Sequence, residues 1–291
     1  MTTMNKSFER IQKRAQEAKA KAAKAESATE ENTPPALPTQ MNLPLELLGH
    51  GARGAPDAVL RSALFAATRP GKRRMLDNEK IASVSNVDIR QTGPQLQQID
   101  LDVWIELVRL AAEAQSSVIT VPVKGLLRRM KRDSGSKSRE SLLSTLRRLN
   151  STLVGISDGK RDYDGTLVFD HSRDERQQLV IQLNPRIAAL FDKTSWSTVQ
   201  LEQRRQLKRQ PLGQWLHGYL SSHARPFPIK VATIRTLSGS TTKTLFHFRD
   251  DLKAAMRKVE EATGWKWQID ATDKLIVDRS TEVEINPQAV D

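Results

Sequence analysis

One order of predicted elements occurs twice in this chain, and it constrains the fold more than any other feature. Residues 100–183 predict a helix, a short strand, a second helix, a turn, a third helix and then β runs. Residues 211–278 predict the same layout, although the two segments show no residue-by-residue repeat. A helix-turn-helix with a trailing β-hairpin is the winged-helix arrangement. The sequence therefore predicts an α+β chain with two tandem winged-helix domains.

Apolar periodicity supports these assignments in both halves. A broad apolar face runs through residues 100–114, with Asp100 or Asp102 as its cap, and leucines recur at helical spacing in residues 138–151. The long helix 241–263 carries a similar stripe and ends at Gly264, a typical C-terminal cap. The other predicted elements are strand-like runs at 61–68, 84–90, 118–121, 153–157, 166–170 and 178–183, helices at 123–131, 211–222 and 228–237, and a hairpin at 265–270 and 274–278.

Composition along the chain sets the domain boundaries. Residues 1–58 predict a flexible arm: an Ala/Lys-rich segment is followed by three prolines in five residues and a Gly-rich stretch. The first winged-helix domain is expected at 59–193, the second at 194–280, and a tail at 281–291.

Several protein classes are excluded by what the sequence lacks. It contains no cysteine, which rules out disulfides and Cys-ligated zinc or iron–sulfur sites. It contains no run of 18 apolar residues, and its first 31 residues lack the apolar segment of a secretory signal. We therefore expect a cytoplasmic protein with no membrane partner.

The positive charge is concentrated rather than uniform. The formal net charge is +12. Residues 124–150 hold nine basic and two acidic side chains, residues 203–210 hold four basic ones, and residues 225–258 hold eight basic and two acidic ones. These stretches total +17, so the rest of the chain is net −5. A basic excess on the two helix-turn-helix units indicates a nucleic-acid partner.

The third helix of the first half is a candidate DNA-reading element. Small hydroxyls let a backbone approach closely, and arginine can bind guanine through two hydrogen bonds, so Arg148 is a candidate for a base contact. The alternative is an ordinary solvated basic face. The candidate residues here are Lys124, Lys137, Ser138, Arg139, Ser141, Ser144, Arg147 and Arg148.

The second half offers a comparable helix start. Free N–H groups at a helix N-terminus favour phosphate, and hydroxyls with Lys243 suit a DNA contact; simple capping by Ser240 or Thr241 is the alternative. The candidates are Thr241, Thr242, Lys243, Thr244 and His247. Between the halves, Arg204, Arg205, Lys208 and Arg209 are expected either to follow the DNA backbone or to form a solvated helix face.

A short segment at residues 40–45 has two interpretations. Gln40, Met41, Leu43 and Leu45 resemble the peptide by which bacterial proteins dock on the DNA polymerase sliding clamp. The glutamine amide would anchor the peptide and the apolar side chains would fill a pocket. The alternative is an apolar staple that packs on the protein's own domain.

Catalytic patterns are largely missing, so we expect no enzyme activity and no cofactor. The sequence has no phosphate-binding P-loop and no His-x-His pair. Tyr163 and Tyr219 are the two tyrosines, and structural roles explain both better than nucleophilic ones. A rolling-circle nicking enzyme, which needs a catalytic tyrosine near a metal, is therefore disfavoured.

Three runs of residues resemble plasmid replication initiators of the TrfA type. They are Arg61–Phe65, Pro185–Phe191 and Tyr219–Lys230, and the resemblance spans about residues 59–280. It implies a bacterial protein that is associated with a plasmid and has two winged-helix domains that bind iterons, the repeats of a plasmid origin. It also implies origin opening without ATP hydrolysis, recruitment of the host replicative helicase and initiator, and copy control through self-association. One family member carries a clamp-docking peptide at a similar place, although here Leu-Pro-Leu replaces a terminal aromatic residue.

Two hypotheses about function are consistent with two DNA-binding winged-helix domains. The first hypothesis is a replication initiator that binds double-stranded origin DNA. The second is a sequence-specific transcriptional repressor or autoregulator.

Overall fold

Helices and strands alternate along the whole described chain, so the predicted mixture of α and β structure is confirmed. The computed structural model describes residues 39–44, 49, 51–69, 71, 73–84, 86–160, 162–176, 178–192 and 194–280. The predicted N-terminal helix or arm up to residue 38, and the tail from residue 281, lie outside the described residues.

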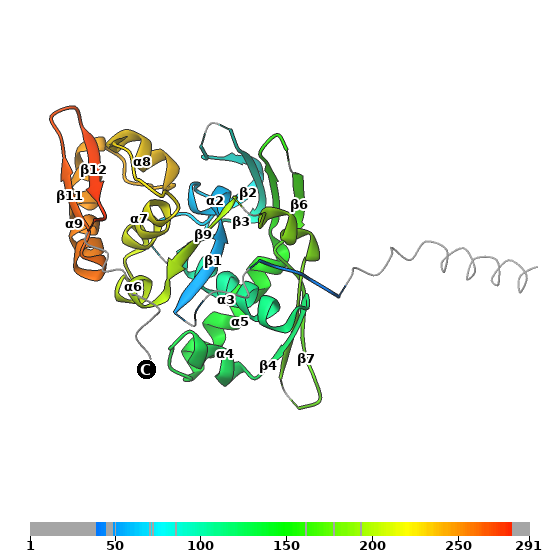
Figure 1. Cartoon of the computed structure of the whole chain (residues 1–291). Coiled ribbons are helices and arrows are strands. Elements are labelled where there is room, and N and C mark those ends of the chain that lie inside the picture. Colours follow the sequence, from blue (N-terminus) through cyan, green and yellow to red (C-terminus); the bar gives the residue numbers. More distant parts are fainter. Residues whose placement is uncertain are drawn as a thin grey trace, which may run out of the picture. The chain divides into compact units, whose positions relative to one another are not determined.

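The first half folds in the predicted order of helix, strand, helix, helix and strands (Figure 1). Its antiparallel three-stranded sheet has the order β4-β8-β7. The elements are α3 (Gln98–Ala114), β4 (Val118–Val121), α4 (Val123–Arg129), α5 (Ser136–Ser151), β7 (Val168–Arg173) and β8 (Leu179–Leu183).

A second sheet in the first half differs from the sequence expectation. Its antiparallel order is β2-β3-β5-β6, so the run after α5 joins this sheet and not the one with β7. Residues 61–65 form turns and bends, which makes the predicted strand at 61–68 wrong. The strands are β2 (Met75–Ile81), β3 (Asp88–Pro94), β5 (Leu153–Ser157) and β6 (Asp162–Thr166).

The second half repeats the layout of the first, including its strand pairing. The sheet order is β10-β12-β11, so in both halves the strand before the second helix pairs with the last strand. Apart from β5 and β6, which have no counterpart in the second half, the two halves therefore correspond in element order and in strand pairing. The elements are α7 (Pro211–Ser221), β10 (Ile229–Lys230), α8 (Val231–Leu237), α9 (Leu245–Thr263), β11 (Lys266–Ile269) and β12 (Lys274–Asp278).

Strand β1 (Ala52–Pro56) corrects the expected flexible linker up to residue 58. It pairs antiparallel along its whole length with β9 (Trp196–Gln200), from Ala52 opposite Gln200 to Pro56 opposite Trp196. Gly54 and Pro56 weaken strand propensity, and the strand forms because β9 supplies its hydrogen-bond partner. The remaining elements are α2 (Asp57–Leu60), the 3₁₀ helix η1 (Pro185–Leu190) and α6 (Leu201–Gln206).

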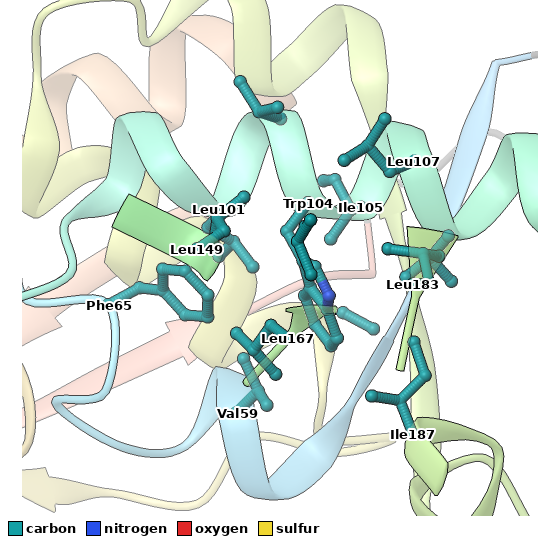
Figure 2. Packing of buried hydrophobic residues seen from close by; sticks show 14 of the residues in the cluster. Val59, Phe65, Leu101, Trp104, Ile105, Leu107, Leu149, Leu167, Leu183 and Ile187 are labelled. Atoms are coloured by element: carbon teal, nitrogen blue, oxygen red, sulfur yellow. The ribbon is translucent and has the colours of Figure 1, made fainter. Parts of the chain in front are cut away.

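Each half has its own buried cluster of apolar side chains. In the first, Trp104 of α3 is fully buried and stacks on Phe65 at a centroid distance of 6.0 Å. Figure 2 shows α3 residues such as Leu101 and Trp104 beside Leu149 of α5 and Leu167. The second cluster joins α7, α8 and α9 through residues such as Trp215, Phe248 and Met256.

The two halves also contact each other directly. The Trp215 indole Nε1 donates to the Ser62 carbonyl at 2.8 Å, and Ala67 N donates to the Ser238 carbonyl at 2.7 Å. Gly239 has φ +63°, and a Cβ there would lie 3.0 Å from the Ala63 Cβ. The turn before α9 is therefore fitted closely against the first half.

The residues that cap α3 and α9 differ in part from those that the sequence predicted. Gln97, not Asp100 or Asp102, is the N-cap of α3, and Asp100 accepts from the Gln97 backbone N–H as in a capping box. Thr244 caps α9, so that helix begins four residues after the predicted start. Gly264 ends it in the left-handed conformation, as predicted.

Candidate nucleic-acid interface

A cleft of about 630 Å³ brings two of the predicted basic stretches together. One wall comes from the end of α4 and the start of α5, and the other from α6 and the turn that leads into α7. Residues predicted from separate parts of the sequence therefore share one site. Those that line it are Lys137, Ser138, Ser141, Arg204, Arg205, Lys208 and Arg209.

The rim of this cleft carries exposed positive charge. Lys137, Lys208 and Arg209 are exposed, and no carboxylate of the described residues forms an ion pair with them. By contrast, Arg205 is paired with Glu202 at 2.6 Å. Three exposed cations that form no close ion pair lie on one rim, and their combined positive charge attracts a polyanion.

The turn that begins α5 is fixed by Asp133. Its Oδ1 accepts from the Gly135 N–H at 3.0 Å. Hydrogen bonds from this N–H and from the Ser138 hydroxyl lower the pKa of Asp133, and the nearby Lys208 adds to the shift. The carboxylate therefore stays charged and holds Ser138 at the helix start, beside the cleft.

Arg204 does not have the position expected of a DNA contact. Its side chain is buried, and its Nε donates to Oδ1 of Asp102 in α3. The other guanidinium nitrogens bond the Gln214 carbonyl at 3.0 Å and Gln98 Oε1 at 2.9 Å. Arg204 therefore joins the two halves beneath the cleft. The DNA-contact prediction is corrected because a paired, buried guanidinium cannot reach a phosphate.

Arg148 is turned inward in the same way. It donates to Asp100 Oδ1 through Nη2 at 2.7 Å and to Ser144 Oγ through Nη1 at 2.6 Å. In this structure the Arg148 guanidinium is therefore paired rather than free for the predicted base contact, and the Ser144 hydroxyl accepts one of its hydrogen bonds. The basic candidates predicted in this region that remain exposed are Lys124, Lys137, Arg139 and Arg147.

The candidates before α9 lie outside the cleft, in a region of their own. Thr241, Lys243, Thr244 and His247 are exposed, and the Thr244 hydroxyl accepts from the His247 N–H at 3.2 Å. Capping thus occurs at Thr244 and not at Ser240 or Thr241. Thr242 donates to Asp251 Oδ2 at 2.8 Å, which ties the turn to the helix.

The outward face of α9 was missed by the sequence reasoning. Phe246, Asp250, Lys253 and Arg257 are exposed and lie opposite the buried Phe248–Leu252–Met256 stripe. Their spacing of four, three and four residues places them on one face of the helix. This face could have been found from the sequence, since it is the complement of the apolar stripe.

Segment 39–44 lies against the first half rather than extending away from it. Met41 is 2% exposed and Leu43 is 4% exposed. Thr39 accepts from the Ser117 N–H at 2.6 Å, and Met41 N donates to the Gln115 carbonyl at 3.3 Å. This is the packing of the apolar-staple alternative. Leu45 lies outside the described residues.

Neither tyrosine has the exposure of a nucleophile. Tyr163 is buried and its hydroxyl donates to the Thr166 carbonyl at 2.8 Å, and burial raises its pKa far above the usual value. Tyr219 is also buried, and burial raises its pKa too. In the part of the chain that the structure describes, no cluster of three or more histidines and carboxylates has the arrangement of a metal site. No helix there has the length and apolarity to cross a membrane.

Comparison with known proteins gives one family. The model described as TrfA protein matches residues 40–271. The plasmid replication initiator protein TrfA of Escherichia coli is 26% identical over 227 residues, which cover 71% of this chain and 56% of that protein. The chain thus spans about half the length of this relative.

Solved structures of another protein resemble the fold. Domains 2 and 3 of RctB superpose with a TM-score of 0.53 at 11% identity, over 77% of this chain and 96% of that one. A second structure of RctB domains 2 and 3 gives a TM-score of 0.47 at 12% identity, over 75% of this chain and 94% of that one. The first match shows a shared fold.

Proposed function

Because this chain belongs to the TrfA family, we propose that it initiates plasmid replication by binding repeated sequences, iterons, at the plasmid origin. The observation that carries the proposal is the duplicated topology. Each half has a long helix that follows a helix-turn unit, and each has a three-stranded sheet of the same order. A protein with two matched reading units suits a DNA site with two matched segments.

In this proposal each half is a winged-helix domain. Helices α5 and α9 enter successive major grooves on one face of the duplex, and the β7–β8 and β11–β12 hairpins lie beside them as wings. Exposed cations on α5 such as Arg139 and Arg147 support this use of the first helix. Lys243 and His247 support it for the second.

We propose that the DNA phosphate backbone between the two major grooves binds in the basic cleft. Lys137, Lys208 and Arg209 reach its rim from both halves. Backbone contacts of this kind fix register and make affinity strongly dependent on salt.

Binding of several protomers to adjacent repeats strains the DNA and opens an A·T-rich segment, in the mechanism that we propose. The host replicative helicase and initiator then join the complex, and self-association limits copy number. The protein acts without catalysis of its own. The burial of both tyrosines supports this last point, because a strand-cleaving nucleophile must reach a phosphate.

A plasmid-replication assay tests the proposal. A plasmid that carries only the cognate origin is introduced with the gene supplied in trans, and footprinting is carried out on the same origin. Replication that depends on the protein, with protected repeats, supports initiation. Protection of a promoter without replication supports the repressor alternative, which uses the same DNA-binding modules.

A further inference from the structure

The strongest unexplained feature outside the cleft is Phe246, the second residue of α9. Its side chain is 66% exposed. The other exposed large apolar side chains of the described residues lie on strands or in a loop: Met75, Leu153, Phe169 and Phe227. The buried stripe of α9 uses none of this ring, since Phe246 lies on the opposite face of the helix.

The residues that share its face are charged. Lys253 and Arg257 are exposed and form no ion pair with any described carboxylate, and Asp250 is the one acid on this face between Phe246 and Arg257. From Phe246 to Arg257 the helix rises about 16 Å, at 1.5 Å per residue. The major groove is about 12 Å wide. With Phe246 at the base edges, Lys253 and Arg257 therefore reach the phosphates at the rim.

Within a major groove an aromatic ring has few apolar partners. The faces of paired bases are stacked and covered, and their edges present hydrogen-bond donors and acceptors. The exception is the 5-methyl group of thymine, which side chains such as phenylalanine contact directly. An exposed phenylalanine on the groove face of α9 is therefore matched to thymine and to no other base.

We propose that Phe246 is a specificity-determining residue that reads a thymine methyl group through α9. This inference rests on the proposed DNA-binding function and deepens it by naming the base recognised. The His247 ring packs edge-on against Phe246 at a centroid distance of 5.5 Å and an interplanar angle of 69°. That contact restricts the phenylalanine ring, so less freedom is lost when it meets the methyl group.

The experiment removes the methyl group without changing any hydrogen bond. A duplex selected from a random library by the full chain is the probe, and each thymine in it is replaced in turn by deoxyuridine. For wild-type protein we expect a loss of affinity of about fourfold at one or more positions, the value for one buried methyl group. Phe246→Ala is expected to bind thymine and uracil duplexes equally, and Phe246→Leu to keep part of the difference.

Phe227→Ala is the matched control. Phe227 is 59% exposed but lies in the loop before β10, so this variant is expected to discriminate like wild type. Wild-type indifference to every replacement overturns the inference, as does full discrimination by Phe246→Ala or a selected site without thymine. If the library yields no selected sequence at all, the proposed function itself fails, and the two failures are therefore distinguishable.

Discussion

Arg148 of α5 and Asp100 of α3 form an ion pair with an Nη2–Oδ1 distance of 2.7 Å. The Asp100 side chain is completely buried, and its second oxygen accepts from Arg73 Nη1 at 2.6 Å. One carboxylate thus fixes the C-terminal part of α5 and the segment before β2. The orientation of α5, the proposed DNA-reading helix, is therefore set by an ion pair within the protein and does not depend on bound DNA.

Arg148→Ala is expected to destabilise the protein, while its neighbour Arg147 behaves differently. Removing one partner of a buried pair costs about 3–5 kcal/mol, and the 17% exposure of the Arg148 side chain places this case at the lower end. Arg147→Ala is expected to leave the free energy of unfolding unchanged and to weaken DNA binding, because Arg147 is exposed. Urea unfolding and mobility-shift titration measure the two effects. Equal unfolding free energies for both variants would contradict the assignment.

Arg204→Ala is expected to lower the free energy of unfolding by about 3 kcal/mol, because Asp102 and Gln98 lose their shared buried partner. Arg205→Ala removes a more exposed pair with Glu202 and is expected to cost less than about 1 kcal/mol. Denaturant titration gives both values. The salt dependence of DNA binding separates the roles: for Arg204→Ala the slope is expected to match wild type, and a reduced slope would restore Arg204 as a phosphate contact.

Neutralising the cleft rim is expected to weaken DNA binding equally for all sequences. Lys137→Gln, Lys208→Gln and Arg209→Gln each remove one phosphate contact, so the slope of log K against log salt is expected to change by about 1 per variant. Lys80→Gln is the control, since Lys80 lies on β2 outside the cleft and is paired with Asp88. Fluorescence titration between low and moderate salt measures the slopes. A rim variant that behaves like Lys80→Gln removes its residue from the backbone contacts.

Stability is expected to fall as pH drops from 7 to 5 because of His217. Burial, together with Arg204 and Arg279, lowers the pKa of His217 to about 3. In the unfolded chain His217 has a pKa near 6.5, so it binds a proton there that it does not bind in the folded protein. The free energy of unfolding therefore falls by about 1.4 kcal/mol for each pH unit below 6.5. Over this range wild type is expected to lose about 2 kcal/mol more than His217→Gln. Denaturant unfolding of both proteins at pH 7 and pH 5 measures this difference. Equal decreases in the free energy of unfolding for wild type and His217→Gln would contradict a buried neutral histidine.

The sequence was informative where structure is local. The stripes in α3, α5 and α9, and Gly264 at the end of α9, follow from residues within one helix. Strand β1 could not be predicted in this way, because Ala-Arg-Gly-Ala-Pro becomes a strand through pairing with β9, more than a hundred residues later. Strand β2 is similar: it is largely polar, and Asn78 interrupts it with a positive φ.

The candidate site was predicted from stretches of sequence that are rich in lysine and arginine. Such a stretch does not reveal which of its cations are paired with carboxylates in the folded protein. Arg148 and Arg204 were grouped with Lys137 and Lys208, because all four lie in basic stretches. Their partners, Asp100 and Asp102, are 48 and 102 residues away in the chain, so the pairing is invisible without the fold. Conversely, Phe246 carries no charge and was overlooked for that reason.

The pairing of β1 with β9 bears on the spacing of the two helices that we propose to bind DNA. The segment that leaves the first half is held as a strand, and Arg204 and Trp215 bond the second half to Asp102 and Ser62 of the first. These contacts oppose any change in the separation and relative rotation of α5 and α9. A duplex advances about 3.4 Å and turns about 34° per base pair. Inserting a single base pair between the two contacted segments therefore puts one helix out of phase with its groove. Under the proposed function, the repeats that this protein binds are therefore expected to have a constant length as well as a constant sequence.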